Sequence, residues 1–332
     1  MSESTRRPVV VVTGGTAGIG RATVREFATA GYDVAVLARG QAGLDGAVAD
    51  IEALGGKALG IPVDVADVEA VEAATDRIED ELGEIDVWVN NAFVGSLAFF
   101  WDTSPEEYAR MTDVTYYGQV NGTRAALRVM RARGRGSIVN VSSSLAHRSI
   151  PLQSAYCGAK HAVKGFTESV RVELKATGSQ VTIGLVTLPG VNTTQFNWNL
   201  NRMPDHPQPV APILEPETVA KAIRSSAEHP RRNTWVGVAT VYTVLGNRVA
   251  PAFMDWYLGR TGVDAQQTDE QAPEWGSNVF EPQDDDVDRG ARGAFSDNSM
   301  TFDPVSLVSR SVAVPKAVVG AALGGVRSRL GR

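Results

Sequence analysis

The 332-residue sequence has very little cysteine and histidine and no excess of positive charge. A single cysteine, Cys157, excludes an intramolecular disulfide. The four histidines show no metal-ligand spacing, so no metal site is expected. With 32 basic and 38 acidic residues the net charge is -6, and the chain lacks the positive field that nucleic-acid binding usually requires. We therefore expect neither a metalloprotein nor a nucleic-acid partner.

Long apolar runs are also missing. The N-terminus passes from polar residues directly into a predicted strand, without an apolar segment of signal-peptide length, so a reduced, cytoplasmic protein is expected. Near the other end, the apolar stretch AVVGAALGGV within residues 312–332 falls short of the roughly 20 residues that span a bilayer. We expect a short helix there that packs on its own domain, with weak peripheral membrane contact through its basic residues as the alternative.

Short apolar runs alternate with longer stretches of helical period over the first 190 residues. This alternation is typical of βαβ units, and wholly apolar runs are typical of strands buried on both faces. We predict an α/β fold of Rossmann type, with a doubly wound parallel sheet in three α/β/α layers. The predicted strands are Val9–Val12, Val34–Ala38, Ala58–Pro62, Ile85–Asn90, Ser137–Val141, Val181–Thr187 and Thr234–Val238. The predicted helices are Gly20–Ala30, Leu44–Leu54, Val68–Leu82, Pro105–Arg131, Ser154–Ala176 and Glu217–Glu228.

The character of the chain changes after Tyr257. Residues 265–304 are polar, contain the acidic run Glu281–Asp288 and show neither helical nor strand period, as expected of a mobile tail. Four aromatic residues in this region could instead clip it to the surface. We predict a flexible N-terminus over residues 1–7, one folded domain over 8–257, a polar mobile tail over 258–311 and a short apolar and basic helix over 312–332.

A glycine-rich segment, TGGTAGIG at residues 13–20, joins the first predicted strand to a helix. Glycines at such a junction permit a tight turn, the approach of a pyrophosphate to backbone N–H groups and close packing of helix on strand. The helix N-terminus also attracts an anion. This context predicts a dinucleotide site, and a tight turn without a ligand is the alternative. The candidate residues are Gly14, Thr16, Gly18, Ile19 and Gly20.

The second predicted strand ends with Ala38 and Arg39, at the position that faces the adenosine ribose in such a site. A carboxylate there would accept from both ribose hydroxyls and repel a 2′-phosphate, whereas an arginine pairs with that phosphate. Because Ala38 replaces the acid, Arg39 favours NADP(H) over NAD(H). Asp64 and Val65, after the third strand, are predicted to meet the adenine, although an aspartate in that place is also a common helix-starting residue.

The glycine-rich segment and four later motifs together resemble, in their order, the short-chain dehydrogenase/reductase family. The later motifs are Asn90-Asn91-Ala92, Asn140-Val141-Ser142-Ser143, Tyr156-Cys157-Gly158-Ala159-Lys160 and Pro189-Gly190. The resemblance covers residues 8–257 and implies a dehydrogenase or reductase that acts on an alcohol or carbonyl group with a nicotinamide cofactor. It implies that Asn91, Ala92, Pro189, Gly190 and Thr193 help to hold that cofactor. It also implies a homodimer or homotetramer, paired through the long helices predicted at 105–131 and 154–176.

Tyr156 and Lys160 lie four residues apart on one predicted helix and therefore share a face. A free phenol has a pKa of about 10, which a neighbouring ammonium and an oxidised nicotinamide would lower toward neutrality. By the resemblance, Lys160 also binds the nicotinamide ribose, and Ser143 donates to the substrate oxygen. In reduction the cofactor gives the hydride and Tyr156 gives the proton. A surface pair without chemistry is the alternative.

Three positions depart from the family pattern. Thr115 stands where many members have an asparagine whose backbone holds a lysine-bound water, so Thr115 is a weak catalytic candidate. Its side chain leaves open whether the helix still bends there. Phe93 replaces the glycine that usually follows Asn-Asn-Ala and adds a ring near the nicotinamide half. The spacing after Pro189 leaves both Thr193 and Thr194 as candidates for contact with the cofactor.

The segments that wall the substrate in this family are rich in aromatic and aliphatic residues here, namely 93–101, 145–153 and 195–203. They favour a small, mainly apolar alcohol or carbonyl substrate over a phosphorylated sugar, although some of the rings could instead pack in the core or at a subunit interface. The alternative function is a dinucleotide-binding sensor or scaffold with little catalysis, suggested by Thr115, Phe93 and the long tail.

Overall fold

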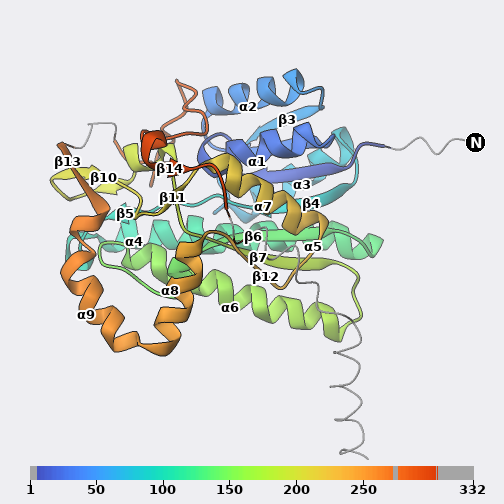
Figure 1. Ribbon diagram of the computed structural model, residues 1–332. Helices are drawn as coiled ribbons and strands as arrows, with labels where there is room; N and C mark the ends of the chain where they lie inside the picture. The colour runs from blue at the N-terminus through green and yellow to red at the C-terminus, as the bar shows by residue number, and fades with distance from the viewer. Residues whose placement is uncertain (1–5, 272–275, 304, 306–332) are drawn as a thin grey trace, which may run out of the picture.

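The computed structural model describes residues 6–271, 276–303 and 305, and its centre is a seven-stranded sheet (Figure 1). The strand order is β12-β7-β6-β4-β1-β2-β3, and every neighbouring pair is parallel. This confirms the predicted Rossmann-type sheet. The strands are β1 (Val9–Thr13), β2 (Asp33–Ala38), β3 (Ala58–Pro62), β4 (Ile85–Asn90), β6 (Ser137–Ser143), β7 (Thr182–Leu188) and β12 (Asn233–Trp235).

The first strand shows why the sheet forms where it does. Val9, Val10, Val11 and Val12 are all 0% exposed, and alternate members enter different hydrophobic clusters. Val10 and Val12 pack under one helical layer, whereas Val9 and Val11 pack under the other. Burying each valine is worth about 1.5–3 kcal/mol relative to leaving it exposed. A continuous apolar run is therefore stabilised as a central strand covered on both sides.

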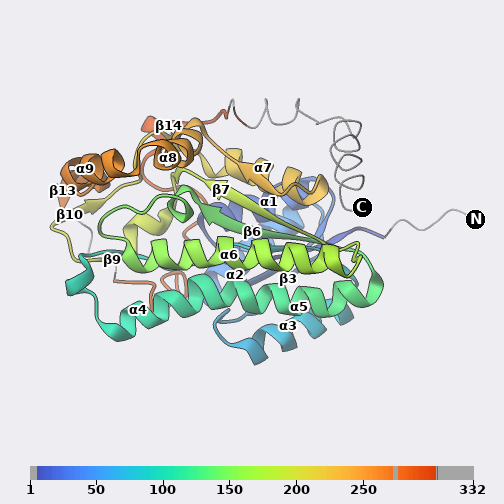
Figure 2. The same ribbon diagram turned by 90° about the horizontal axis from the view of Figure 1, so that it is seen from below.

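Helices form one layer on each face of the sheet, as Figures 1 and 2 show. One layer contains α1 (Gly18–Thr29), α2 (Gln41–Ala53) and α7 (Pro216–Glu228). The other contains α3 (Val68–Glu81), α4 (Pro105–Thr112), α5 (Gly118–Arg133) and α6 (Ser154–Ala176). Figure 2 shows α5 and α6 side by side along the sheet. Two further helices, α8 (Val238–Val249) and α9 (Pro251–Thr261), lie beyond the carboxyl ends of the strands.

Two parts of this domain differ from the sequence prediction. The single helix predicted over 105–131 is interrupted by a π-helical turn, η2, at Asp113–Tyr117. The helices α8 and α9 were not predicted at all. Most of their apolar side chains lie outside the core, such as Val249 at 84% and Phe253 at 58% exposure. Without one buried stripe, their apolar residues do not give the amphipathic pattern by which a helix is recognised.

The remaining strands are short and build small sheets beside the cleft. β5 (Ser96–Leu97) pairs with β9 (Leu200–Asn201), and β10 (Asp205–Pro207) pairs with β13 (Gln267–Gln271). β11 (Ile213–Leu214) pairs in parallel with β8 (Gly190–Val191) on one side and with β14 (Ser299–Met300) on the other. These pairings connect the segments that follow β4 and β7 and attach the C-terminal part of the chain to the domain.

Residues 276–303, called the C-terminal segment below, run back across the domain and pack on it. This differs from the mobile tail predicted over 258–311. Its Asp288 forms an ion pair with buried Arg21, and β14 adds a strand to β11. The physical reason is pairing of polar groups together with apolar contacts, which a polar composition does not reveal. Phe295, one of the four aromatic residues expected to clip the region to the surface, lies against Phe196 and His206. The apolar and basic segment 312–332 lies outside the described residues, as do residues 1–5, whereas Arg6 of the predicted flexible N-terminus pairs with Asp86.

Among the helices of the described residues, none combines the length and the apolar character that crossing a membrane requires. In the same residues, no group of three or more His, Cys, Asp or Glu side chains is arranged to hold a metal ion.

Candidate active site

The glycine-rich loop turns between β1 and α1 as its sequence predicts. Gly18 has a φ of +55°, a left-handed conformation that favours glycine. Gly20 is required for another reason, because a Cβ there would lie well inside 3.0 Å of the Gly14 carbonyl oxygen. The third glycine therefore lets α1 begin directly against the loop, which points its N-terminal N–H groups into the cleft.

Asn91 fixes this loop from the neighbouring strand. Its side-chain nitrogen donates to the carbonyl oxygens of Thr13 and Gly14, each at 3.1 Å. The Thr13 hydroxyl in turn accepts from the backbone N–H groups of Asn91 and Ala92, at 3.0 and 3.1 Å. Asn91 lines the cleft as predicted, but its amide donors are used to hold the glycine loop in place. Its buried Oδ1 has no hydrogen-bond partner among the described residues.

The predicted adenosine residues meet at the other end of the cleft. Arg39 follows β2, and its guanidinium donates to the carbonyl oxygens of Phe280 and Asn278 in the C-terminal segment, at 2.6 and 2.5 Å. Burial lowers the pKa of Arg39, and the charge of Arg110 lowers it further. Asp64 forms an ion pair with Arg110 and also accepts from the Ala66 N–H at 3.0 Å. Asp64 therefore lies in the wall of the cleft, whereas the residue that starts the following helix α3 is Asp67, whose side chain accepts from the Ala70 N–H.

Ser143 and the Tyr156/Lys160 pair come together at the carboxyl end of β6. The side chains of Ser143 and Tyr156 are hydrogen-bonded, as expected for a serine and a phenol that share one substrate oxygen. Lys160, 2% exposed, donates from Nζ to the Val141 carbonyl oxygen at 2.9 Å. Burial lowers the pKa of Lys160 to about 7. The helix α6 therefore holds the ammonium and the phenol on one face, as their spacing predicts.

The pKa of the phenol differs from the expectation. Burial raises the pKa of Tyr156 above its usual value, and the hydrogen bond with Ser143 only partly opposes this effect. The sequence argument expected Lys160 to lower it. In this arrangement the same desolvation that acts on Tyr156 also makes the lysine easier to deprotonate, so the lysine supplies less positive charge. The proximity was predicted correctly, whereas the dominance of burial was not.

Thr115 lies at the centre of the π-helical turn η2 and is 0% exposed. Its hydroxyl donates to the Val94 carbonyl oxygen at 2.9 Å and accepts from the Val94 N–H at 3.1 Å. The wide turn is therefore present with threonine in the usual asparagine position. Thr115 uses its side chain to hold the loop after β4.

Phe93 occupies the boundary between the cleft and the catalytic pair. Its ring centroid lies 5.5 Å from that of Tyr156, and Lys160 Nζ lies 5.4 Å from the Phe93 centroid. A cation at this distance from a ring face is attracted to it. The departure from glycine at this position thus places a ring directly against two predicted catalytic side chains.

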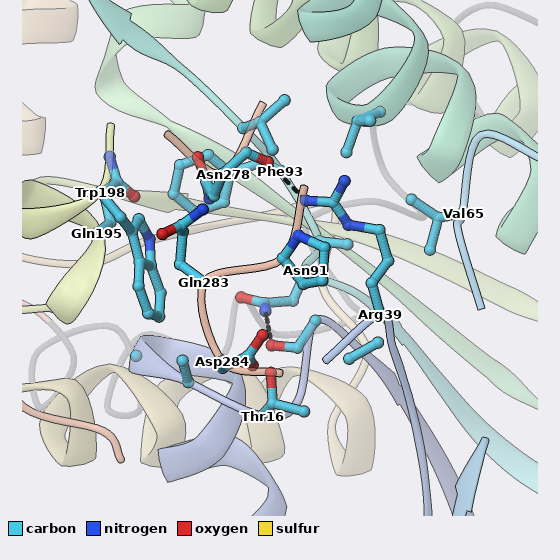
Figure 3. A pocket seen from close by; sticks show the side chains of 18 of the residues that line it. Thr16, Arg39, Val65, Asn91, Phe93, Gln195, Trp198, Asn278, Gln283 and Asp284 are labelled. Atoms are coloured by element: carbon cyan, nitrogen blue, oxygen red, sulfur yellow. Dashed lines mark hydrogen bonds between the residues drawn. The ribbon is translucent and has the colours of Figure 1, made fainter. Parts of the chain in front are cut away.

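The cleft has a volume of about 860 Å³ including its open mouth (Figure 3). Ten predicted residues line it: Gly14, Thr16, Gly18, Ile19, Arg39, Asp64, Val65, Asn91, Ala92 and Thr193. Seven others do not: Gly20, Thr115, Ser143, Tyr156, Lys160, Pro189 and Gly190. Phe93 lines the cleft and contacts Tyr156, so it connects the two groups.

Sequence reasoning missed the four residues that the C-terminal segment adds to the cleft, namely Asn278, Pro282, Gln283 and Asp284. Gln195 and Trp198, from the segment predicted to wall the substrate, line this cleft as well. Figure 3 shows the Asp284 carboxylate beside the Thr16 side chain. The acidic run Glu281–Asp288 was the signal in the sequence that could have placed this segment in the cleft. A site for a phosphorylated ligand is rich in hydrogen-bond donors, and carboxylates bind to the same donors.

The surroundings of the cleft fit a dinucleotide. Gly14 and Gly18 of the glycine-rich loop line it, and α1 begins at Gly18. Thr194 lines the cleft, and its buried hydroxyl has no hydrogen-bond partner among the described residues. A buried polar atom without a partner is costly, so a ligand that bonds to it would be stabilised.

Comparisons with known proteins agree with this geometry. The profile of the short chain dehydrogenase family matches residues 8–205. The chain belongs to this family. It is 36% identical to an uncharacterized oxidoreductase of Bacillus subtilis over 69% of this chain and 65% of that protein. A 3-oxoacyl-[acyl-carrier-protein] reductase of Synechocystis is 34% identical over 67% of this chain and 90% of that protein.

The fold comparison points the same way. The crystal structure of a short-chain dehydrogenase from Streptomyces avermitilis aligns with a TM-score of 0.65 at 27% identity, covering 78% of this chain and 99% of that one. The match to the Bacillus relative spans less than two thirds of that relative's length. The matching profile and the structural alignment show the family, and with it a site for a nicotinamide dinucleotide.

Proposed function

We propose that this chain is an NADP(H)-dependent oxidoreductase that interconverts an apolar alcohol with a ketone or aldehyde, with Tyr156 as the acid and base. The observation that carries the proposal is the meeting of Ser143, Tyr156 and Lys160 next to a cleft built on a glycine-rich loop. When bound, the nicotinamide supplies or accepts the hydride.

Each catalytic side chain has a defined task in this proposal. In reduction, Tyr156 delivers its phenolic proton to the carbonyl oxygen, and in oxidation it removes the alcohol proton. Ser143 donates to the same oxygen and stabilises the charge that develops on it. Lys160, released from the Val141 carbonyl, would bind the nicotinamide ribose and keep the phenol in reach of a positive charge. A buried lysine with a pKa of about 7 can change its protonation state near neutrality at little cost.

The walls of the substrate space support an apolar substrate. The three segments expected to form these walls lie together, because Ser96 pairs with Leu200 and the Ala98 N–H donates to the Leu152 carbonyl oxygen at 3.0 Å. Phe99 and Trp101 stack on one another at 4.9 Å in the first of these segments. The Synechocystis relative is named for a keto group on an acyl chain, which is a related class of substrate.

The preference for NADP(H) is supported by the adenosine end. Ala38 ends β2 where a carboxylate would accept from the ribose, and Arg39 offers a guanidinium next to it. The N-terminus of α2 follows directly and adds backbone donors and a favourable dipole for a phosphate.

The test combines cofactor binding with turnover. We expect purified protein to change NADPH fluorescence and to reduce members of a panel of apolar ketones and aldehydes. Tyr156→Phe should retain NADPH binding and lose turnover by about 10²- to 10⁴-fold, the usual worth of a positioned general acid. Unchanged turnover in that variant would exclude the mechanism.

The second candidate is a dinucleotide-binding sensor or scaffold with little catalysis. It is favoured by the Phe93 ring against Tyr156 and by the C-terminal segment in the cleft. The same panel distinguishes the two functions. NADPH binding without turnover of any member would favour the sensor.

A further inference from the structure

The C-terminal segment places an apolar side chain in the predicted adenine pocket. Val279 is 1% exposed and packs in one cluster with Val65 and Val114, with partly buried Ala92 against it. Val65 is the residue predicted to meet the adenine, and Ala92 is one of the predicted cofactor residues. Because Val279 is fully buried in the predicted adenine pocket, it excludes water from that pocket as a bound adenine would.

The same segment uses the donors that a 2′-phosphate needs. Arg39 donates to the carbonyl oxygens of Asn278 and Phe280, on either side of Val279. At the N-terminus of α2, the Gln41 N–H donates to the Asp285 carboxylate at 3.0 Å. The next two N–H groups, of residues 42 and 43, donate to the carbonyl oxygens of Asp285 and Asp284 at 3.0 and 2.9 Å. The N-terminus of α2 and Arg39, which could bind an anion, are therefore already hydrogen-bonded to the C-terminal segment.

The helix α2 is shaped to receive this segment. Gly40, Gly43 and Gly46 are spaced three residues apart and share one face. A Cβ at Gly40 or Gly43 would lie well inside 3.0 Å of the Asp284 carboxylate, and one at Gly46 would meet Asp288 in the same way. A glycine inside a helix costs about 1 kcal/mol relative to alanine. The carboxylates of the C-terminal segment fill the space that the missing side chains leave on α2.

A second anchor lies at the glycine-rich loop. Arg21, 2% exposed, binds both carboxylate oxygens of Asp288 at 3.0 Å each. The Gly18 N–H, at the start of α1, donates to the Gly290 carbonyl oxygen at 3.1 Å. The segment thus contacts, in order, the base pocket, the phosphate donors beside the ribose and the loop that receives the pyrophosphate.

We propose that residues 278–290 are a built-in competitor of the adenosine half of the dinucleotide, which must leave the cleft before NADP(H) can bind. The proposal rests on the proposed function for the identity of the competing ligand. Arg39 and the α2 N–H groups cannot serve the segment and a 2′-phosphate at once. The apparent affinity for NADP(H) is therefore reduced by the fraction of molecules in which the cleft is closed. A partner or solution condition that draws the segment away would activate the protein.

The decisive variants change the segment and leave the cofactor residues intact. Val279→Asn removes the apolar plug, and Val287→Asn makes the same change at a side chain in the same segment that is 50% exposed. Gly46→Ala is an independent variant, since its methyl group would displace Asp288 while removing nothing from the core. Circular dichroism and thermal unfolding establish that each full-length variant is folded.

We expect Val279→Asn and Gly46→Ala to bind NADPH and adenosine 2′,5′-bisphosphate about ten-fold more tightly than wild type, with Val287→Asn unchanged; ten-fold corresponds to about 1.4 kcal/mol. Hydrogen exchange of wild type supplies a second readout. The amides of residues 278–290 should exchange faster when adenosine 2′,5′-bisphosphate is bound.

Other outcomes separate the competitor from the proposed function. Slower exchange in the bound state, or weaker binding by Val279→Asn, would overturn the competition and make the segment a wall of the cofactor site. Equal affinity of all variants together with carbonyl turnover would overturn the competition alone. Failure of every variant to bind either probe would overturn both proposals.

Discussion

The two ends of the cleft are closed by different parts of the chain. At the catalytic end, Phe93 comes from the loop directly after β4 and contacts Tyr156 and Lys160. At the adenosine end, Val279 and Asp284 come from a segment more than two hundred residues away from Arg39 in sequence. The first closure belongs to the family domain, whereas the second comes from outside the matched residues 8–205.

The catalytic end therefore determines the chemical step, whereas the adenosine end determines whether the cofactor can enter the cleft. At the catalytic end, Ser143 on β6 and Lys160 on α6 are buried and Tyr156 is partly buried, so these side chains are held by the core of the domain. The adenosine end is closed by backbone carbonyl groups and carboxylates that can be exchanged for other acceptors. Changes at the first end should therefore act on turnover and stability, and changes at the second end should act on cofactor affinity.

The largest effect is expected at Lys160. Lys160→Met removes the ammonium from Tyr156 and the proposed bond to the nicotinamide ribose, so kcat should fall by about 10²- to 10⁴-fold and NADPH binding should weaken as well. Tyr156→Phe is expected to reduce kcat alone. Steady-state kinetics and fluorescence titration distinguish the two patterns. Lys164→Met, one turn later on α6, is the matched control and should change neither quantity.

Lys160 should also make stability depend on pH. The unfolded lysine has a pKa of about 10.4, whereas burial lowers the pKa in the folded protein to about 7. Between these values the unfolded state binds more protons, so the free energy of unfolding should rise with pH from about 7 to about 10. In Lys160→Met this rise should be smaller by an amount on the order of a few kcal/mol. Urea unfolding at pH 6.5 and 9.5 measures it, and an identical rise in both proteins would contradict the burial of a titrating lysine.

A smaller effect is expected at the adenosine end. Arg39→Ala removes charge-assisted hydrogen bonds worth about 1.5–3 kcal/mol, so the preference for NADPH over NADH should fall by roughly 10- to 100-fold. The variant also loosens the C-terminal segment, because it loses two bonds to its carbonyl groups. That loosening helps both cofactors equally, and the ratio of their kcat/KM values therefore isolates the 2′-phosphate. An unchanged ratio would remove the argument for NADP(H).

The same comparison explains how far the sequence could predict the molecule. The run Val9–Val12 was sufficient to predict a central strand, because a strand buried on both faces is wholly apolar. The Tyr156/Lys160 spacing was sufficient to predict that the two side chains share a face, because it depends only on the period of the helix. The position of Val279 was not predictable, because a single valine in a polar stretch has no period. Its burial depends on Val65 and Val114, which lie far from it in the sequence. The glycines of α2 that face Asp284 and Asp288 likewise show their purpose only when the two segments meet. The raised pKa of Tyr156 likewise depends on the surrounding side chains rather than on its motif.

The smallest effect should come from the residue that departs from the family pattern, Thr115. Its hydroxyl makes two hydrogen bonds with the backbone of Val94 at a site that is 0% exposed. Thr115→Val keeps the shape and leaves both Val94 groups without these bonds, so the free energy of unfolding should fall by about 1–3 kcal/mol. Thr115→Ser retains the hydroxyl and should lose less than Thr115→Val does. Denaturant unfolding of the two variants checks the order. If both lose the same amount, packing of the methyl group rather than the hydroxyl holds the loop after β4, and Phe93 is then positioned by shape alone.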